Sequence, residues 1–134
     1  MGWTKPGSEG ELHEMVCDYL RYSYPEALFH SDFGSGLKMT YPQAVRQRKI
    51  QKMRAWPDIL IPEPRGGYHG LFLELKREGE KVTLKDGVTP VASEHIREQT
   101  EVLGMLSERG YRATFSIGFD QSRGIIDEYL NLGT

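Results

Sequence analysis

The spacing of apolar and polar residues along the chain predicts four helices and four strands. Helices are expected at 8–22, 42–53, 93–109 and 120–130, and apolar residues recur every three or four positions in the first and third of them. Strands are expected where short apolar or alternating runs lie between turn residues, at 27–30, 58–61, 70–76 and 111–118. The order α-β-α-β-β-α-β-α predicts an α/β fold with a mixed central sheet flanked by helices.

Residues that begin and end helices support three of these elements. Ser8 and Glu11 form an S-x-x-E capping box, and Ser93 and Asp120 are the expected N-caps of the third and fourth helices. Gly110 is expected to end the third helix. Two connections are expected to be irregular because they are rich in glycine and polar residues, namely 31–39 and 77–92.

Two short motifs carry the candidate chemistry, Pro57-Asp58 and Glu74-Leu75-Lys76. Side chains alternate along a strand, so Glu74 and Lys76 share one face of strand 70–76. A hairpin centred on Gly66 places Asp58 directly opposite Glu74. Opposed like charges destabilise a sheet, and a divalent metal ion between the two carboxylates is the natural explanation. The alternative is a solvated strand face with an ordinary surface ion pair.

Three residues on two helices are expected near the same site. Glu9 lies in the first helical turn, on the core-facing stripe, and is the acid of that helix best placed to reach the metal face. A favourable interaction with the helix macrodipole is the alternative. His13 lies one turn further along and supports Glu9 or has a structural role. Gln99 falls on an apolar stripe, where a polar side chain needs a partner.

A basic segment leads directly into Asp58. The formal net charge is −2, so any attraction to nucleic acid must come from a local patch. Residues 46–54 contain five basic residues and no acid, which favours contact with phosphates over a merely solvated face. The candidate DNA-binding residues are Arg46, Arg48, Lys49, Lys52 and Arg54, with Tyr68 as a further candidate for stacking or phosphate contact.

Length and composition narrow the class of protein. The 134 residues fit a single domain spanning 1–134. A single cysteine, Cys17, excludes an intramolecular disulfide and a cysteine-rich zinc site. The sequence contains no signal peptide and no apolar run long enough to cross a bilayer. We therefore expect a cytoplasmic protein with no membrane partner.

These residues resemble the PD-(D/E)XK nucleases, and more narrowly the small standalone VRR-NUC proteins of bacteria and phages. The resemblance spans most of the chain: the opening helix with Glu9, the basic run into Trp56-Pro57-Asp58, the stretch 64–76, and the helix from Ser93 through Gln99 followed by Gly110-Tyr111. The departures are His13 where the family has Gln, Ala55 where Gly is usual, Asp32-Phe33 where Pro-Asn is common, and an apparent insertion at 81–92.

The resemblance implies a restriction-endonuclease-like fold and Mg²⁺- or Mn²⁺-dependent hydrolysis of DNA phosphodiester bonds. We expect the metal ligands to be Asp58, Glu74, the backbone carbonyl of Leu75 and, directly or through water, Glu9. Lys76 is expected to orient or activate the water, and Gln99 to hold Lys76 or a phosphate. Standalone relatives are similar to homodimeric resolvases of four-way junctions, so the expected partners are branched or duplex DNA and a second copy. The alternatives are a flap or restriction-type endonuclease, or a catalytically silent DNA-binding module.

Overall fold

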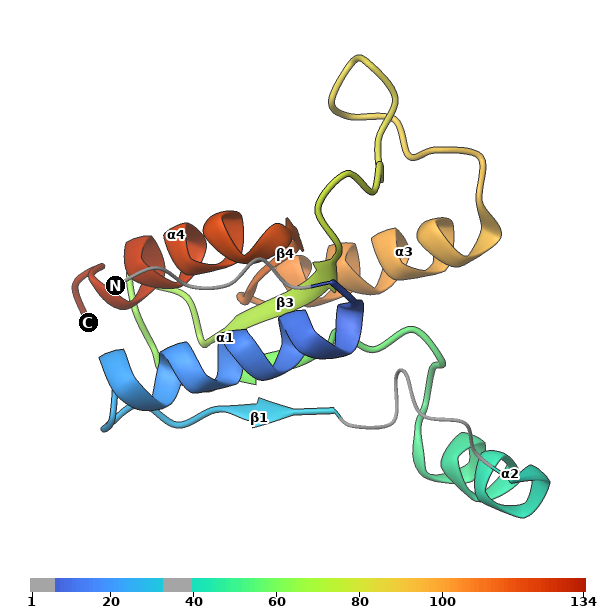
Figure 1. Ribbon diagram of the computed structural model, residues 1–134, viewed down its shortest axis with the longest axis horizontal. Helices are drawn as coiled ribbons and strands as arrows, with labels where there is room; N and C mark the ends of the chain where they lie inside the picture. The colour runs from blue at the N-terminus through green and yellow to red at the C-terminus, as the bar shows by residue number, and fades with distance from the viewer. Residues whose placement is uncertain (1–6, 33–39) are drawn as a thin grey trace.

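Eight helices and strands follow one another in the part of the chain that the computed structural model describes, residues 7–32 and 40–134. In chain order they are α1 (Glu9–Ser23), β1 (His30–Ser31), α2 (Tyr41–Ile50), β2 (Ile59–Ile61), β3 (Leu71–Lys76), α3 (Glu94–Glu108), β4 (Arg112–Ile117) and α4 (Gly118–Leu130). The sheet has the order β1-β2-β3-β4, antiparallel except for the parallel pair β3–β4 (Figure 1). The predicted α/β order and mixed sheet are confirmed.

The hairpin formed by β2 and β3 has the predicted register. Ile59 pairs with Leu73, and Ile61 pairs with Leu71. Extending this register by one residue brings Asp58, which immediately precedes β2, opposite Glu74. The two candidate acids therefore meet at the end of the hairpin that lies away from its turn.

The two faces of the sheet pack against different helices. On one face the three leucines of β3 join α1 and α4 in the larger core, whose helical members include Leu12, Val16, Leu20, Ile126 and Tyr129. On the other face Phe72 packs against Val102 and Leu106 of α3. Side chains alternate along β3, so Glu74 and Lys76 lie on the α3 face with Phe72.

Polar contacts fix α1 at both ends. The Ser8 hydroxyl accepts the Glu11 N–H at 3.1 Å, as a capping box predicts, but the Glu11 carboxylate accepts the Gly7 N–H at 2.7 Å rather than that of Ser8. Near the other end, the hydroxyls of Tyr19 and Tyr24 both donate to Oδ1 of Asp127 on α4, at 2.6 and 2.7 Å. The two tyrosine bonds hold α1 against α4 on the same face of the sheet.

The prediction that Asp120 caps the last helix was wrong. The helix begins two residues earlier, and Asp120 lies within its first turn. The strand passes directly into the helix at Gly118, whose φ of +82° suits glycine. The Gln121 side chain accepts the Ile117 N–H at 2.6 Å, so it satisfies a donor at the helix start.

Two other boundaries also differ from prediction. The first strand was expected at 27–30 but is confined to His30–Ser31, because β1 pairs only with the short β2. The second helix was expected at 42–53 but ends at Ile50, and it begins with a capping box in which Thr40 and Gln43 bond reciprocally. Most of the expected loop 31–39 lies outside the described residues.

Two segments project from the body of the molecule (Figure 1). Helix α2 buries none of its residues. Residues 82–91, here called the arm, form a long excursion between β3 and α3 and carry no helix or regular strand. No helix within residues 7–32 and 40–134 is long and apolar enough to span a membrane.

Candidate active site

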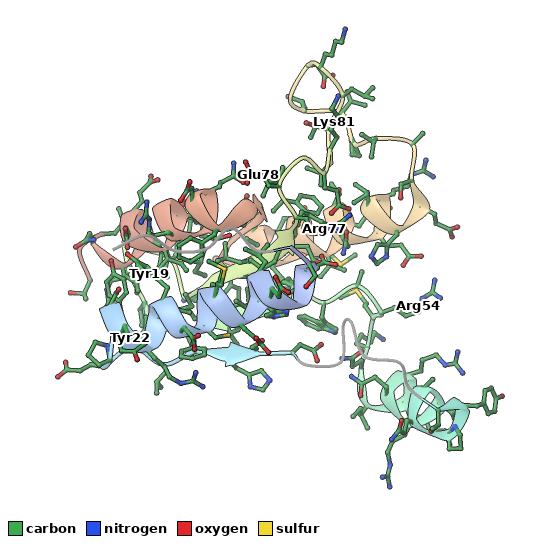
Figure 2. The ribbon with its side chains drawn as sticks, in the orientation of Figure 1. Tyr19, Tyr22, Arg54, Arg77, Glu78 and Lys81 are labelled. Carbon is green, nitrogen blue, oxygen red and sulfur yellow. The ribbon has the colours of Figure 1, made fainter. Side chains whose placement is uncertain are left out.

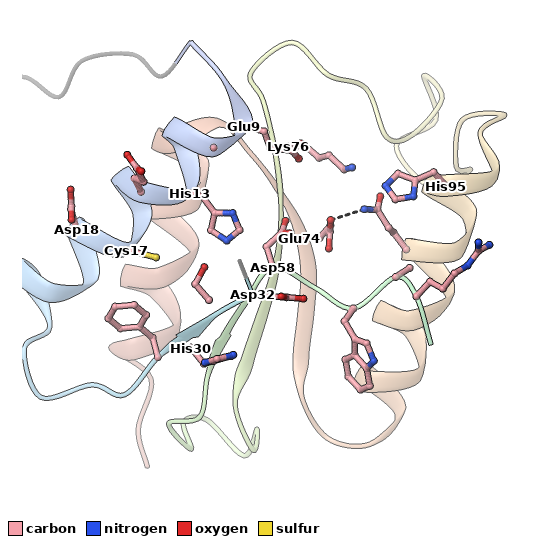
Figure 3. A pocket seen from close by; sticks show the side chains of 18 of the residues that line it. Glu9, His13, Cys17, Asp18, His30, Asp32, Asp58, Glu74, Lys76 and His95 are labelled. Carbon is pink, nitrogen blue, oxygen red and sulfur yellow. Dashed lines mark hydrogen bonds between the residues drawn. The ribbon is translucent and has the colours of Figure 1, made fainter. Parts of the chain in front are cut away.

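A cavity of about 1170 Å³ opens at the end of the sheet where β3 finishes. Its wall is built from one side of α1, from β1, from residues 54–58, from the end of β3 and from the start of α3 (Figure 3). It brings together most of the candidate residues, namely Glu9, His13, Arg54, Asp58, Glu74, Lys76 and Gln99. Residues from four separate parts of the sequence thus share one concave site.

Asp58 is held against β3 by a backbone hydrogen bond. Its Oδ2 accepts the Leu75 N–H at 2.7 Å. Asp58 and Glu74 are each only 4% exposed. Because β2 starts only at Ile59, the Asp58 side chain takes the place of a strand partner for Leu75. The chain therefore fixes one carboxylate beside the other, with little water to screen their repulsion.

Burial is the main cause that raises the pKa of Glu74, and the neighbouring Asp58 carboxylate adds to it while Lys76 opposes it; the net result is a pKa of about 9. At neutral pH the metal-free protein therefore carries Glu74 in its protonated form. Its Oε2 is buried with no donor directed at it from the described part of the chain. Once the proton is lost, a buried carboxylate oxygen without a donor is costly, so something else must then satisfy it.

Gln99 holds the other oxygen of Glu74. Its Nε2 donates to Glu74 Oε1 at 2.6 Å, and Gln99 is itself only 4% exposed (Figure 3). The sequence predicted that a buried Gln99 needs a partner at the edge of the site, and this partner is now known. It is Glu74, whereas Lys76 or a phosphate was expected.

Lys76 lies on the same face as Glu74 and is buried. Its Nζ is 4.0 Å from Oε1 of Glu80, whose backbone N–H donates to the Arg77 carbonyl at 3.1 Å. Glu80 was missed by the sequence analysis. The available signal was its position four residues after Lys76, but that spacing has meaning only once a turn is known to follow β3.

Glu9 and His13 border the cavity from α1. Glu9 is exposed, although its place on the core-facing stripe suggested burial. Partial removal from water nevertheless raises its pKa, and the Lys76 charge opposes this rise. His13 is half-buried, and its Nε2 has no hydrogen-bond partner among the described residues. Figure 3 shows the His13 ring on the side of α1 that faces Asp58.

The cavity is also lined by polar residues that were not singled out as site candidates, among them His30, Asp32 and His95. His95 precedes Gln99 by one helical turn, so the spacing on the predicted helix already placed both on one side. The Asp32 N–H donates to the Asp58 carbonyl at 2.8 Å. This bond continues the pairing of β1 with β2 by one residue and so places Asp32 at the site. That contact is not visible in the sequence.

The predicted DNA-binding residues divide into three groups. Arg54 borders the cavity and pairs with Glu98 of α3 at 2.9 Å. Four exposed residues lie on α2 or just after it, namely Arg46, Arg48, Lys49 and Lys52. Tyr68 lies in the β2–β3 turn with its ring 6.2 Å from that of Tyr129, so the structure does not bring it to the cavity. Figure 2 shows Arg54 on the segment that joins α2 to β2.

The donor set suits a hard cation that keeps part of its water shell. Two buried carboxyl groups face each other, and one of their oxygens lacks a donor. Within residues 7–32 and 40–134, no three His, Cys, Asp or Glu side chains are grouped to hold a metal ion by themselves. Mg²⁺ is typically held by one or two carboxylates with several waters rather than by an all-protein cage. The residues therefore fit such an ion.

Comparison with solved structures shows a fold in common with a VRR_NUC domain protein. The two chains superpose with a TM-score of 0.68 over 97% of this chain and 93% of the other, at 24% sequence identity. No protein-family model and no curated protein sequence matches this chain. The overall architecture is therefore that of a VRR-NUC domain, and the chemistry must be argued from the site itself.

Proposed function

We propose that this chain is a VRR-NUC-type nuclease that hydrolyses DNA phosphodiester bonds with the help of Mg²⁺ or Mn²⁺. The observation that carries the proposal is the buried pair Asp58 and Glu74, with Lys76 two residues further along the same strand face. A purely structural sheet gains nothing from two facing buried carboxyl groups. Similarity in fold to a VRR_NUC domain protein supports the same conclusion.

The metal would be held by Asp58 and Glu74 and by the backbone carbonyl of Leu75. The N–H and C=O of one strand residue point to the same edge of the strand, and the Leu75 N–H points at Asp58. The Leu75 carbonyl is therefore directed to the same edge of β3, beyond the residue at which β2 begins. Glu9 is close enough to interact electrostatically with Asp58 and Lys76 and would act through water. When bound, the cation lowers the pKa of a coordinated water and screens phosphate charge.

Each remaining residue has a role that follows from its contacts. Lys76 is a buried cation beside the carboxyl pair and would orient the attacking water and stabilise the negative charge that develops on the phosphate. Gln99 is a positioning residue, because it holds Glu74 and not the substrate. Glu80 lies 4.0 Å from Lys76 and restrains the lysine when no phosphate is present.

Exposed cations near the cavity would bind the DNA backbone. Helix α2 is basic, buries nothing and leads through Arg54 to the cavity, so its side chains are free to reach phosphates. Contacts of this kind position DNA without reading its sequence. This suits an enzyme selective for DNA shape. The favoured substrate is branched DNA, cut by a homodimer whose two sites are related by two-fold symmetry, as in a resolvase of four-way junctions.

The test is cleavage of labelled four-way junction, flap and linear duplex DNA, with Mg²⁺, Mn²⁺ or EDTA. Wild type is compared with Asp58→Asn, which keeps an acceptor for the Leu75 N–H but removes the charge. Asp120→Asn is the matched control, because the Asp120 side chain is 93% exposed on α4. We expect metal-dependent cutting by wild type and by the control, and a loss of about a hundredfold or more in Asp58→Asn.

The pattern of products separates the competing functions. Preferred cutting of the four-way junction supports the resolvase assignment, and preferred cutting of flaps or of one duplex sequence supports a flap or restriction-type enzyme. Binding without cutting under every condition would contradict the nuclease proposal and leave a DNA-binding module. Sedimentation of the protein with and without DNA tests the homodimer directly.

A further inference from the structure

The arm is a hydrogen-bonded hairpin, whereas an irregular connection was expected. The Leu84 N–H donates to the Thr89 carbonyl at 2.7 Å, and residues 83 and 90 form an antiparallel bridge. At the tip, Oδ1 of Asp86 accepts the N–H groups of Val88 and Thr89, both at 2.9 Å. A network of this kind holds the tip in one shape, so its side chains are presented in a fixed arrangement.

The tip of the arm presents two apolar side chains to solvent, next to an exposed lysine. Leu84 is 52% exposed and Val88 is 80% exposed, whereas Val82 at the base is only 7% exposed. Lys85 at the tip and Lys81, which directly precedes the arm (labelled in Figure 2), are both exposed, whereas the Asp86 carboxylate is engaged by Val88 and Thr89. Exposed apolar side chains beside lysines are unfavourable in water and disfavour a basic partner. They favour a partner that offers apolar surface next to negatively charged groups.

The arm is fixed next to the candidate catalytic residues. It follows β3 within six residues of Lys76, and the Glu80 carboxylate at its base lies 4.0 Å from Lys76 Nζ. Each leg has about five residues and so extends roughly 16 Å at the rise of a strand. DNA bound with a phosphate at the cavity therefore lies within reach of the tip.

Resting on the proposed nuclease function, we propose that the arm is a wedge that enters DNA at a branch point and selects branched over linear substrates. Leu84 and Val88 contact the faces of bases that have no stacking neighbour at the branch, and Lys81 and Lys85 contact the phosphates on either side. Apolar side chains inserted between base steps are an established way of holding distorted DNA. Base faces are already open at a branch, so the wedge meets less resistance there than in linear duplex.

A second copy of this chain is the competing occupant of the tip. Lys85 disfavours that arrangement, because a symmetric contact brings the two Lys85 side chains together while each Asp86 carboxylate is engaged by Val88 and Thr89 of its own tip. The experiment separates the two occupants.

The test compares wild type with two double variants, Leu84→Ser/Val88→Ser and Leu84→Lys/Val88→Lys. Leu28→Ser is the matched control, since Leu28 is 65% exposed and is not part of the arm. The first readout is the ratio of cleavage rates on four-way junction and linear duplex. The second is the fluorescence of 2-aminopurine placed at the branch, measured in EDTA. We expect the ratio to fall roughly tenfold or more in both double variants. We also expect these variants to lose the increase in 2-aminopurine fluorescence that wild type causes on binding. The control keeps both.

The lysine variant separates apolar insertion from charge. If the tip acted only through charge, added lysines would strengthen the preference for the junction, and that result would overturn the wedge. An unchanged ratio in both double variants would also overturn it, while leaving the nuclease intact. If wild type sediments as a dimer and the double variants as monomers, the tip is a contact between copies and the wedge is again overturned. Failure of wild type to cut any DNA is seen before any ratio is measured, and it identifies failure of the nuclease proposal itself.

Discussion

Gln99 Nε2 donates a 2.6 Å hydrogen bond to Glu74 Oε1 and so connects α3 to the carboxyl pair on β3. Both side chains are 4% exposed, so water does not compete for this bond. Oε2 of Glu74 has no donor directed at it from the described residues, so the Gln99 bond helps to orient this carboxyl group. The sheet register places Glu74 opposite Asp58, and the orientation of its carboxyl group depends in part on a residue 25 positions away in the sequence.

Replacing Gln99 with Ala should weaken metal binding and cleavage without abolishing DNA binding. Residues that orient metal ligands typically contribute about 10–100-fold to affinity or activity when they are removed. Calorimetric titration of Mn²⁺ and single-turnover cleavage at saturating protein measure the two effects. Thr100→Ala on the neighbouring position of α3 is the control. Unchanged Mn²⁺ affinity in Gln99→Ala would show that Gln99 does not position a ligand.

The raised pKa of Glu74 predicts that the metal-free protein becomes less stable as the pH rises. Between the ordinary value of 4.5 and about 9, the folded protein holds a proton that the unfolded chain has lost. The free energy of unfolding must therefore fall with increasing pH across this window, by up to about 1.4 kcal/mol for each pH unit. Denaturant unfolding in EDTA at pH 5 and pH 8 measures the change.

Glu74→Gln should remove most of this pH dependence, because the amide resembles the protonated acid and has no proton to lose. Its carbonyl oxygen still accepts from Gln99, and its amino group donates towards Asp58. The variant should therefore be more stable than wild type at pH 8 in EDTA, yet inactive with metal. Glu128→Gln, an exposed acid on α4, is the control and should keep the wild-type slope. A wild-type slope in Glu74→Gln would place the titrating group elsewhere.

The hairpin that carries the site could be predicted from sequence because local features determine it. Turn residues around Gly66 mark its centre, and the alternation of β3 assigns Glu74 and Lys76 to one face. These two features alone give the observed register and the meeting of Asp58 with Glu74. Gln99 was also accessible, since a polar residue on an apolar helical stripe must find a partner.

The contacts that were missed depend on tertiary structure. Glu80 reaches Lys76 only because a turn at Arg77 folds the chain back. Tyr68 neighbours the motif in sequence, but it sits in the turn, and the six-residue strand β3 carries the chain from there to the site. Helix α2 ends earlier than its composition suggested, because it has no apolar face whose packing would extend it. Local pattern cannot supply these facts.

Lys76→Met should abolish cutting and spare DNA binding. The substitution keeps the length of the buried side chain but removes the charge proposed to stabilise the developing negative charge, an effect worth about 10²–10³ in rate. Gel-shift titration in EDTA and single-turnover cleavage in Mg²⁺ measure the two properties separately. Arg109→Met, an exposed cation near the far end of α3, is the control. Cleavage at the wild-type rate by Lys76→Met would remove the lysine from the mechanism.

The exposed cations of α2 should govern the salt dependence of DNA binding. Each cation that contacts a phosphate releases about one counterion, which contributes roughly 0.9 to the slope of log affinity against log salt. Replacing Arg48 and Lys49 with Ala should therefore lower that slope by about 1.8 and weaken binding of every DNA shape alike. Binding titrations at four salt concentrations, with junction and linear duplex, give the slopes.

The control for that pair is Arg109→Ala/Arg123→Ala, which removes the same charge from the C-terminal end of α3 and from within α4. If long-range attraction by net charge were responsible, both double variants would change the slope equally, because the charge lost is identical. If α2 contacts phosphates, only its own variant changes the slope. Arg48 and Lys49 lie on a helix that buries no side chain, so their loss removes no packing and the variant keeps its fold. A reduced slope is therefore assigned to lost phosphate contacts.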